Sequence, residues 1–412
     1  MRSQIKLHLG VSMTDVGKGD AAAVADLVDV DALLSIAAGM VRFPSQIPNE
    51  AALGAFVVER MRSIGGFDEV IVQPVIGDRV NVIGIVRGSG SGPNIVLNGH
   101  LDVGAPLGAW TRDPYEPEIE DGFLYGHGLS DMKGAVAAQI AAASAIARSP
   151  LKRSGDVVVT AVIHHDVCGL GTKFFLGSWD RPIHAAINGE PTDLKIQLAH
   201  GGAWQFELVT YGRAVHSSRK EDGINAITAM ARVMAALDDS VLTHDPELEF
   251  GGLPRLVIGQ IEGGTSPSRT AERCAIRGDI RTLPGMTQET LLADLERVLE
   301  SLRADHPDFK AEVRGTVYQR PFRVDEASPV VGLIQSAHRD VVGRDPDVTD
   351  ELPVSAYVTD STDLARAGIP TVLYGPCAWR TDPNERVRVD DLVTAARVYA
   401  VAALRFVSDP TQ

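Results

Sequence analysis

The sequence predicts an α/β fold, in which a mostly parallel mixed sheet flanked by helices is interrupted by an inserted ferredoxin-like domain. The chain has 412 residues, which is too long for one ordinary hydrophobic core. In its first half, short β-branched runs alternate with stretches of helical periodicity, a pattern typical of a parallel sheet covered on both faces. Near Gly201 the order changes to strand, helix, two strands, helix and strand. We therefore expect a main domain of residues 1–202 and 316–412, and a second domain of residues 203–315.

The first part of the main domain is predicted from periodicity and from the residues that end each run. Short β-branched runs bounded by Gly, Pro or Asn predict buried strands, whereas long Ala-rich runs predict helices. The predicted elements are a helical stretch over 31–62 interrupted near Pro44 and Pro48, strands at 80–86 and 94–98, a helix over 131–147, and a strand at 156–164.

The elements of the second domain and of the end of the chain are predicted from the same patterns. The predicted ferredoxin-like order consists of a strand at 204–211, a helix at 223–237, strands at 256–261 and 274–282, a helix at 288–302 and a strand at 310–317. A helix at 328–342, a strand at 371–374 and a final helix at 390–406 then return the chain to the main domain.

Composition and charge exclude several classes of protein. The net charge of −15 disfavours nucleic acid and anionic membranes as partners, because either would repel the surface at long range. No run of 18 apolar residues occurs, and the N-terminal run is too short for a secretion signal. The three cysteines (Cys168, Cys274 and Cys377) form no CxxC pair, which fits a reducing compartment. We expect a cytoplasmic protein.

Three potential metal ligands follow buried segments of the main domain. The strand IVLNGHLDV ends in His100-Leu-Asp102, Asp131 stands where a Gly-rich loop meets a helix, and Glu190 follows the apolar segment that ends in ING. The carboxyl ends of parallel strands meet at one edge, so these side chains are expected to converge there. One histidine and two carboxylates suit Zn, Mn or Co better than Cu. A buried core histidine and a helix N-cap at Asp131 are the alternatives.

Asp102 lies two residues after His100, a spacing that puts two strand side chains on one face. We expect its carboxylate to orient the His100 imidazole and to fix its tautomer, as the partners of metal-bound histidines commonly do.

The motifs together resemble the metal-dependent amidohydrolase and exopeptidase family of acetylornithine deacetylase, succinyl-diaminopimelate desuccinylase, aminoacylase and glutamate carboxypeptidase. The resemblance runs over most of residues 30–410 and rests on GHLDV, GHGLSDMKG, NGEPT, GRAVHSS, IEGGTSPS, GDIRTLPG and DPNERV. It implies a catalytic α/β domain with an inserted lid and dimerisation domain. It also implies two neighbouring metal ions bridged by the residue matching Asp131, with His100 and Glu190 completing the ligands of one ion.

The chain departs from that family at the second metal ion and at the general base. The family's Glu-Glu pair falls on His165 and Asp166, its late histidine on Thr381, and an asparagine of its GGT segment on Ser268. Aspartate has a shorter arm than glutamate and threonine is a poor ligand. We therefore expect one metal ion per subunit, a second that is weak or absent, and Asp166 only as a weaker ligand candidate.

His165 occupies the position of the family's general base. An unperturbed imidazole titrates near pH 6.5 and is a common general base. Only one of His164 and His165 is expected to face the site, because neighbouring strand residues point in opposite directions. The alternative is that the pair forms a polar turn at the end of a strand.

Two further residues are predicted to bind the substrate by the same resemblance. His216, in GRAVHSS, matches a lid histidine that reaches the substrate across a dimer interface, which implies at least a dimer. Arg320, in YQRPF, matches a residue that clamps a substrate carboxylate in a two-pronged contact. A solvated charge at the hinge is the alternative for Arg320.

These expectations define a metal-dependent hydrolase that cleaves a C–N bond of a small anionic, carboxylate-bearing molecule with metal-activated water. The specific prediction is deamination of an aromatic amine with release of ammonia, as in 5-nitroanthranilate deamination, since attack on an electron-poor ring carbon has less need of a second metal. The alternatives are an N-acyl amino acid deacylase or dipeptidase of the same family, and a non-catalytic metal- or ligand-binding homologue.

Overall fold

A computed structural model describes residues 18–165, 169–238, 240–250, 252–350, 358–380 and 383–408. The chain divides into two compact units, each described here by itself. Unit 1 comprises Met1–Ile196, Val324–Val348 and Asp363–Gln412, and unit 2 comprises Gln197–Arg323 and Thr349–Thr362. No helix in the described ranges is long and apolar enough to cross a bilayer.

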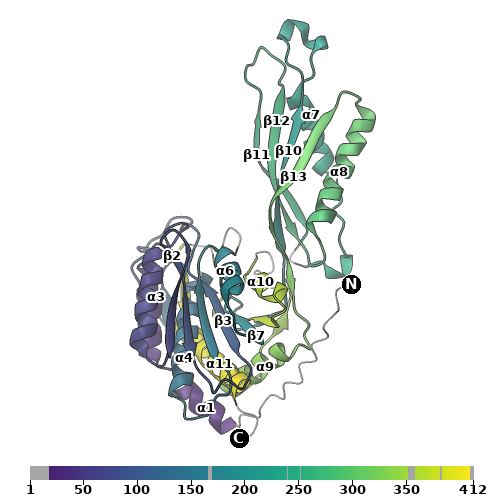
Figure 1. Cartoon of the computed structure of the whole chain (residues 1–412). Coiled ribbons are helices and arrows are strands. Elements are labelled where there is room, and N and C mark those ends of the chain that lie inside the picture. Colours follow the sequence, from purple (N-terminus) through teal and green to yellow (C-terminus); the bar gives the residue numbers. More distant parts are fainter. Residues whose placement is uncertain are drawn as a thin grey trace. The chain divides into compact units, whose positions relative to one another are not determined.

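Unit 1 is built on a mixed sheet (Figure 1). Strands β3, β6, β7 and β16 pair in parallel, whereas β1 and β2 are antiparallel to their neighbours. The sheet order is β1-β2-β6-β3-β7-β16-β8-β15. Its strands are β1 (Glu69–Ile76), β2 (Arg79–Val86), β3 (Ile95–His100), β6 (Val157–Val162), β7 (Ala185–Asn188), β8 (Ile196–Gln197), β15 (Val348–Thr349) and β16 (Thr371–Leu373).

Helices cover both faces of this sheet (Figure 1). The Ala-rich helix α4 is buried along most of its length and packs with α11 over one face, because small side chains allow close approach. On the other face, Phe175 of α6 and Leu364 of α10 join the β-branched side chains of β2, β3 and β6 in one apolar cluster. The helices are α1 (Lys18–Asp26), α2 (Val30–Val41), α3 (Ala51–Ile64), α4 (Gly134–Arg148), α6 (Leu170–Ser178), α9 (Pro329–Val342), α10 (Ser361–Arg366) and α11 (Val389–Val407).

A separate small antiparallel sheet of unit 1 joins distant parts of the chain in the order β17-β5-β4. Its strands are β4 (Glu118–Glu120), β5 (Phe123–Tyr125) and β17 (Arg386–Arg388). The pairing of Arg386 with Tyr125 brings the C-terminal segment beside the loop that leads to Asp131. These strands were not predicted from the sequence, because three residues are too few to show an alternation of buried and exposed side chains.

Unit 2 has the predicted ferredoxin-like order of strands and helices. Its antiparallel sheet runs β11-β12-β10-β13, and the helices follow β10 and β12 along the chain. The elements are β10 (Gly202–Tyr211), α7 (Ala226–Asp238), β11 (Arg255–Gly263), β12 (Arg273–Thr282), α8 (Gln288–Asp305) and β13 (Lys310–Gln319). The remaining short elements are η2 (Ser217–Asp222), η3 (Pro246–Leu248), and β9 (Ala199–His200) paired with β14 (Phe322–Arg323).

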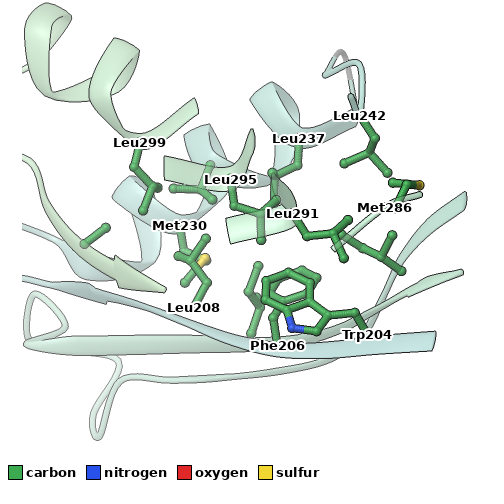
Figure 2. Close-up of a cluster of buried hydrophobic side chains, with 14 of the residues drawn as sticks. Trp204, Phe206, Leu208, Met230, Leu237, Leu242, Met286, Leu291, Leu295 and Leu299 are labelled. Atoms are coloured by element: carbon green, nitrogen blue, oxygen red, sulfur yellow. The ribbon is translucent and has the colours of Figure 1, made fainter. Parts of the chain in front are cut away.

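The core of unit 2 lies between its sheet and its two helices (Figure 2). Trp204 and Phe206 of β10 face Leu291 and Leu295 of α8, and all four are buried. Gly315 on the neighbouring strand β13 makes room for the indole ring, since an added Cβ would lie 2.6 Å from Trp204 Nε1. The predicted fold class, an α/β domain with a ferredoxin-like insertion, is therefore confirmed.

Candidate metal centre

The candidate ligands lie at the carboxyl edge of the parallel strands of unit 1. His100 is the last residue of β3 and pairs with Val162, the last residue of β6. Asn98 pairs with Asn188, the last residue of β7, so Glu190 emerges at the same edge two residues later. Gly375 allows a close approach there, since an added Cβ would lie 2.4 Å from the Glu190 carbonyl oxygen.

His100, His165 and Glu190 bring three potential ligand atoms together in a buried cluster, where these atoms lie within 4.8 Å of one another. Their exposed fractions are 1%, 7% and 0%. Asp131 joins this group through His100, whose Nε2 lies 3.1 Å from Asp131 Oδ1 and 3.8 Å from Glu190 Oε1. The structure therefore brings the three predicted ligands together around one imidazole nitrogen.

The electrostatics of this cluster favour a cation. Burial and the neighbouring His165 oppose protonation of His100. The hydrogen bond to Asp131 and the negative charges of Glu190 and Asp131 outweigh them and raise the pKa of His100 to about 10. Two carboxylates that hold a proton on this imidazole so firmly would also attract a divalent ion, which replaces the proton when it binds. One imidazole and two carboxylates form a donor set that fits Zn, Mn or Co.

The ring of His165 stacks on that of His100, with ring centroids 4.3 Å apart and an angle of 9° between the planes. A metal ion lies near the plane of the imidazole that binds it, about 2.1 Å from the nitrogen. One ion cannot lie in two stacked, nearly parallel ring planes. This geometry favours His165 as a neighbour of the ion rather than as a second ligand beside His100.

His164 is directed away from this cluster. Arg79 donates a hydrogen bond of 2.6 Å to His164 Nδ1 and also forms a buried two-pronged ion pair with Glu50. His164 adopts a φ of 59°, so the chain turns at this residue instead of continuing as a strand. Of the two histidines, His165 is therefore the one that faces His100.

The structure corrects the expected contact of Asp102. Strand β3 ends at His100, so strand alternation does not govern the Asp102 side chain. The main-chain carbonyl of Asp102 lies 2.8 Å from His100 Nδ1, while its carboxylate accepts a 3.0 Å hydrogen bond from the backbone N–H of His165. A proton on Nδ1 would be held by that carbonyl, which leaves Nε2 directed at Asp131 and Glu190.

Asp131 sits in an irregular turn, η1 (Leu129–Lys133), with φ −137° and ψ 91°. Helix α4 begins only at Gly134, and its N-cap position is Lys133, so the N-cap alternative for Asp131 is wrong. Asp131 Oδ2 accepts a 3.2 Å hydrogen bond from the indole N–H of Trp379. This contact could not be predicted from local sequence pattern, because it joins residues 248 positions apart.

Cys377 lies close to the same turn. Its Sγ is 3.7 Å from the Ser130 carbonyl, and burial raises the pKa of the thiol well above its usual value. Burial of this kind is typical of structural cysteines rather than of reactive ones. Three residues singled out from the sequence, Asp166, Cys168 and Thr381, lie outside the described residues.

The two predicted substrate-binding residues belong to unit 2. The exposed His216 is the N-cap residue of η2, and its Nδ1 accepts a 3.2 Å hydrogen bond from the backbone N–H of Ser218. Arg320 is also exposed, with its guanidinium 5.2 Å from the centre of the Tyr318 ring. Ser268, at the altered GGT segment, lies 3.1 Å from Ser266 between the two hydroxyl oxygens.

Comparisons with known proteins find relatives that match most of the chain. The chain is 28% identical over 406 residues to the N-formyl-4-amino-5-aminomethyl-2-methylpyrimidine deformylase of Bacillus subtilis (strain 168), which covers 89% of this chain and 92% of that protein. It is 31% identical over 315 residues to the acetylornithine deacetylase of Erwinia tasmaniensis, covering 74% of this chain and 78% of that protein.

Solved structures show the same fold. The aminopeptidase PepT from Bacillus cereus matches with a TM-score of 0.71 and 19% identity, covering 92% of this chain and 99% of that one. The model of peptidase family M20/M25/M40 matches residues 96–405. The chain therefore belongs to peptidase family M20/M25/M40 and is a metal-dependent hydrolase acting on carbon–nitrogen bonds.

Proposed function

We propose that the chain binds one divalent metal ion through His100, Asp131 and Glu190 and hydrolyses an amide bond of a small carboxylate-bearing molecule. The observation that carries this proposal is the buried His100 imidazole held between two carboxylates at the carboxyl edge of the sheet. The names of the relatives, a deformylase and a deacetylase, support removal of a formyl or acetyl group from an amine better than deamination of a ring.

His165 is the proton carrier in this proposal. A bound divalent ion would polarise the substrate carbonyl and make water easier to deprotonate. His165 lies against His100, within 4.8 Å of the donor atoms of His100 and Glu190, where its imidazole can take a proton from the attacking water. It then returns the proton to the leaving nitrogen. The Asp102 carboxylate holds the backbone at His165 for this task.

A single ion is supported by the environment of Asp131. One of its oxygens faces His100, and the other accepts the Trp379 indole N–H. An N–H group directed at a carboxylate oxygen opposes a cation at the same position. The departures at Asp166 and Thr381 in the sequence agree with this interpretation. We propose Mn, Zn or Co as the ion.

The lid supplies the substrate contacts in this account. We propose that unit 2 acts as a lid and dimerisation domain and that the chain forms at least a dimer, so that His216 can reach the site of a second subunit. A histidine donor placed at a developing oxyanion would stabilise the transition state by a few kcal/mol. Arg320 would bind the substrate carboxylate. The scattered cysteines support a cytoplasmic location.

Deamination of an electron-poor aromatic amine is the second candidate. Two observations favour it: an imidazole replaces the family's carboxylate base, and the Trp379 contact supports a single ion. Water would attack the ring carbon, and ammonia would leave. Deamination is the specific prediction from the sequence. The names of the relatives, however, support amide hydrolysis better than deamination.

A paired substrate panel tests both reactions. The metal-loaded protein is assayed for release of free amine from N-formyl and N-acetyl amines, N-acyl amino acids and dipeptides, and for release of ammonia from aminobenzoates. The Glu190→Gln variant is the control, because it removes one proposed ligand charge. Wild-type turnover of an amide that is lost in this variant supports the proposal. Ammonia release alone favours the second candidate. Silence on both panels with metal bound contradicts both and favours a non-catalytic ligand-binding protein.

A further inference from the structure

The carboxylate of Glu385 is surrounded by donors from the segment that leads to Asp131. Its Oε2 accepts a 2.8 Å hydrogen bond from the backbone N–H of Gly128 and lies 3.2 Å from His127 Nδ1. Its Oε1 accepts 2.7 Å hydrogen bonds from both the backbone N–H and the hydroxyl of Ser130. Glu385 is 4% exposed, so water contributes little to its solvation.

These hydrogen bonds replace the regular pairing that the segment lacks. Gly128 has a φ of 80° and Asp131 is not helical, so the backbone between them is not held by a continuous helix. Buried N–H groups need acceptors, and a carboxylate is a strong one. Glu385 thus fixes two backbone N–H groups on the segment immediately before Asp131.

A buried lysine supports the same arrangement from the other side of Asp131. Lys133 is fully buried and donates a 2.9 Å hydrogen bond to the Phe43 carbonyl. Its backbone N–H donates to the Gly128 carbonyl at 2.8 Å. The turn that carries Asp131 is therefore fixed at both ends, by Glu385 before Asp131 and by the contacts of Lys133 after it.

We propose that Glu385 is a positioning residue of the metal centre, which acts through the backbone of Gly128 and Ser130 to aim the Asp131 carboxylate at the ion. Ser130 directly precedes Asp131, so a change in its backbone angles displaces the carboxylate from His100 Nε2. This inference rests on the proposed function only in assigning Asp131 as a metal ligand. The merely structural alternative is that Glu385 stabilises the fold without affecting the geometry of the ion's ligands.

Glu385→Gln tests the inference, because glutamine keeps the shape but replaces one carboxylate oxygen by an NH2 group. One backbone N–H, of Gly128 or of Ser130, then faces a donor. We expect the affinity of the metal-free protein for Mn²⁺, measured by calorimetry, to fall about 10- to 100-fold, as for other partners of metal ligands. The visible spectrum of the Co²⁺-loaded protein should also change, a readout that simple loss of stability would not move.

Two further variants keep the test decisive. Asp156→Asn is the matched control. Asp156 is also a buried carboxylate that accepts a backbone N–H, that of Gly88. It lies just before the first residue of β6, whereas the candidate metal centre lies at the carboxyl end of the parallel strands. Asp156→Asn should leave Mn²⁺ affinity and the Co²⁺ spectrum unchanged. Ser130→Ala removes only the hydroxyl donor and should weaken Mn²⁺ binding by less than Glu385→Gln does. It also provides the measurement if Glu385→Gln does not fold.

The outcomes separate this inference from the proposed function. Wild-type Mn²⁺ affinity and an unchanged Co²⁺ spectrum in Glu385→Gln would overturn the inference, even if the wild-type protein hydrolyses amides. If Glu385→Gln does not fold, wild-type Mn²⁺ affinity and an unchanged Co²⁺ spectrum in Ser130→Ala would overturn the inference. A different result would separate the two proposals in the other direction. If Glu385→Gln weakens metal binding but the wild-type protein is inactive on both substrate panels, the inference is supported and only the proposed function is contradicted.

Discussion

His165→Ala and His100→Ala are predicted to have different effects, although the two rings stack on each other. Removing His165 should lower kcat and leave metal binding nearly intact, because the parallel ring planes prevent both imidazoles from binding one ion. Removing His100 should abolish metal binding, since His100 Nε2 lies between the two proposed carboxylate ligands.

The expected magnitudes follow from the contacts. Loss of a general base costs about 10²- to 10⁴-fold in rate, or about 2.7–5.5 kcal/mol of transition-state stabilisation. His165 can influence the ion indirectly through its stacking on His100, and an aromatic pair of this kind contributes about 0.5–1.5 kcal/mol. Metal affinity should therefore fall by less than about tenfold in His165→Ala. In His100→Ala, metal affinity should fall by more than about a hundredfold. This exceeds the loss expected when only a residue that hydrogen-bonds to a metal ligand is removed.

Calorimetric titration of the metal-free variants with Mn²⁺ measures affinity, and turnover of the best wild-type substrate at saturating metal measures kcat. Circular dichroism and thermal melting show whether each variant is folded, as His165 is buried. A loss of metal affinity in His165→Ala as severe as that in His100→Ala would show that both rings bind the ion despite their stacking. In that case the His100, His165 and Glu190 group is the ligand set itself.

Three further outcomes are expected. Trp379→Phe removes the N–H donor from Asp131 Oδ2 and should allow a second, weak equivalent of Mn²⁺ to bind; unchanged stoichiometry at millimolar Mn²⁺ would show that the indole does not limit occupancy. Chelation should lower the Tm by several degrees, because an ion present at 100 times its Kd stabilises the folded protein by about 2.7 kcal/mol; an unchanged Tm would argue against a metal held by the fold. Burial lowers the pKa of His338, so its contribution to stability is complete above about pH 6.5 and is lost as the pH falls. His338→Asn should therefore show a smaller decrease in Tm between pH 7 and pH 5 than the wild type, and an identical decrease would contradict this assignment.

The sequence predicted those parts of the fold that depend on local pattern. β-branched runs predicted β2, β3, β6 and β16 of unit 1 and the four strands of the larger sheet of unit 2, and the apolar segment before Glu190 predicted the edge at which this residue lies. The strands β4, β5 and β17 were missed, because three residues are too few to show an alternation, and the eight-residue edge strand β1 was not predicted either.

The details of the candidate site depend on contacts between distant residues. Trp379 and Glu385 contact the turn around Asp131 from about 250 positions away, and neither residue type indicates such a partner by itself. The role expected of the Asp102 carboxylate was wrong in its geometry, because the strand ends at His100 and the main-chain carbonyl contacts the imidazole instead. Local sequence pattern predicts the end of a strand only to within a few residues. An error of two residues at the end of β3 is enough to change whether the carboxylate or the main-chain carbonyl of Asp102 faces His100.

The number of metal ions per chain tests the central claim most directly. Elemental analysis of the dialysed wild-type protein, beside Glu190→Gln and Asp131→Asn, measures it without any assumption about substrate. We predict one tightly bound divalent ion per wild-type chain and a loss of that ion in both variants. Two tightly bound ions in the wild type, or one ion retained in both variants, would contradict a single metal centre held by His100, Asp131 and Glu190.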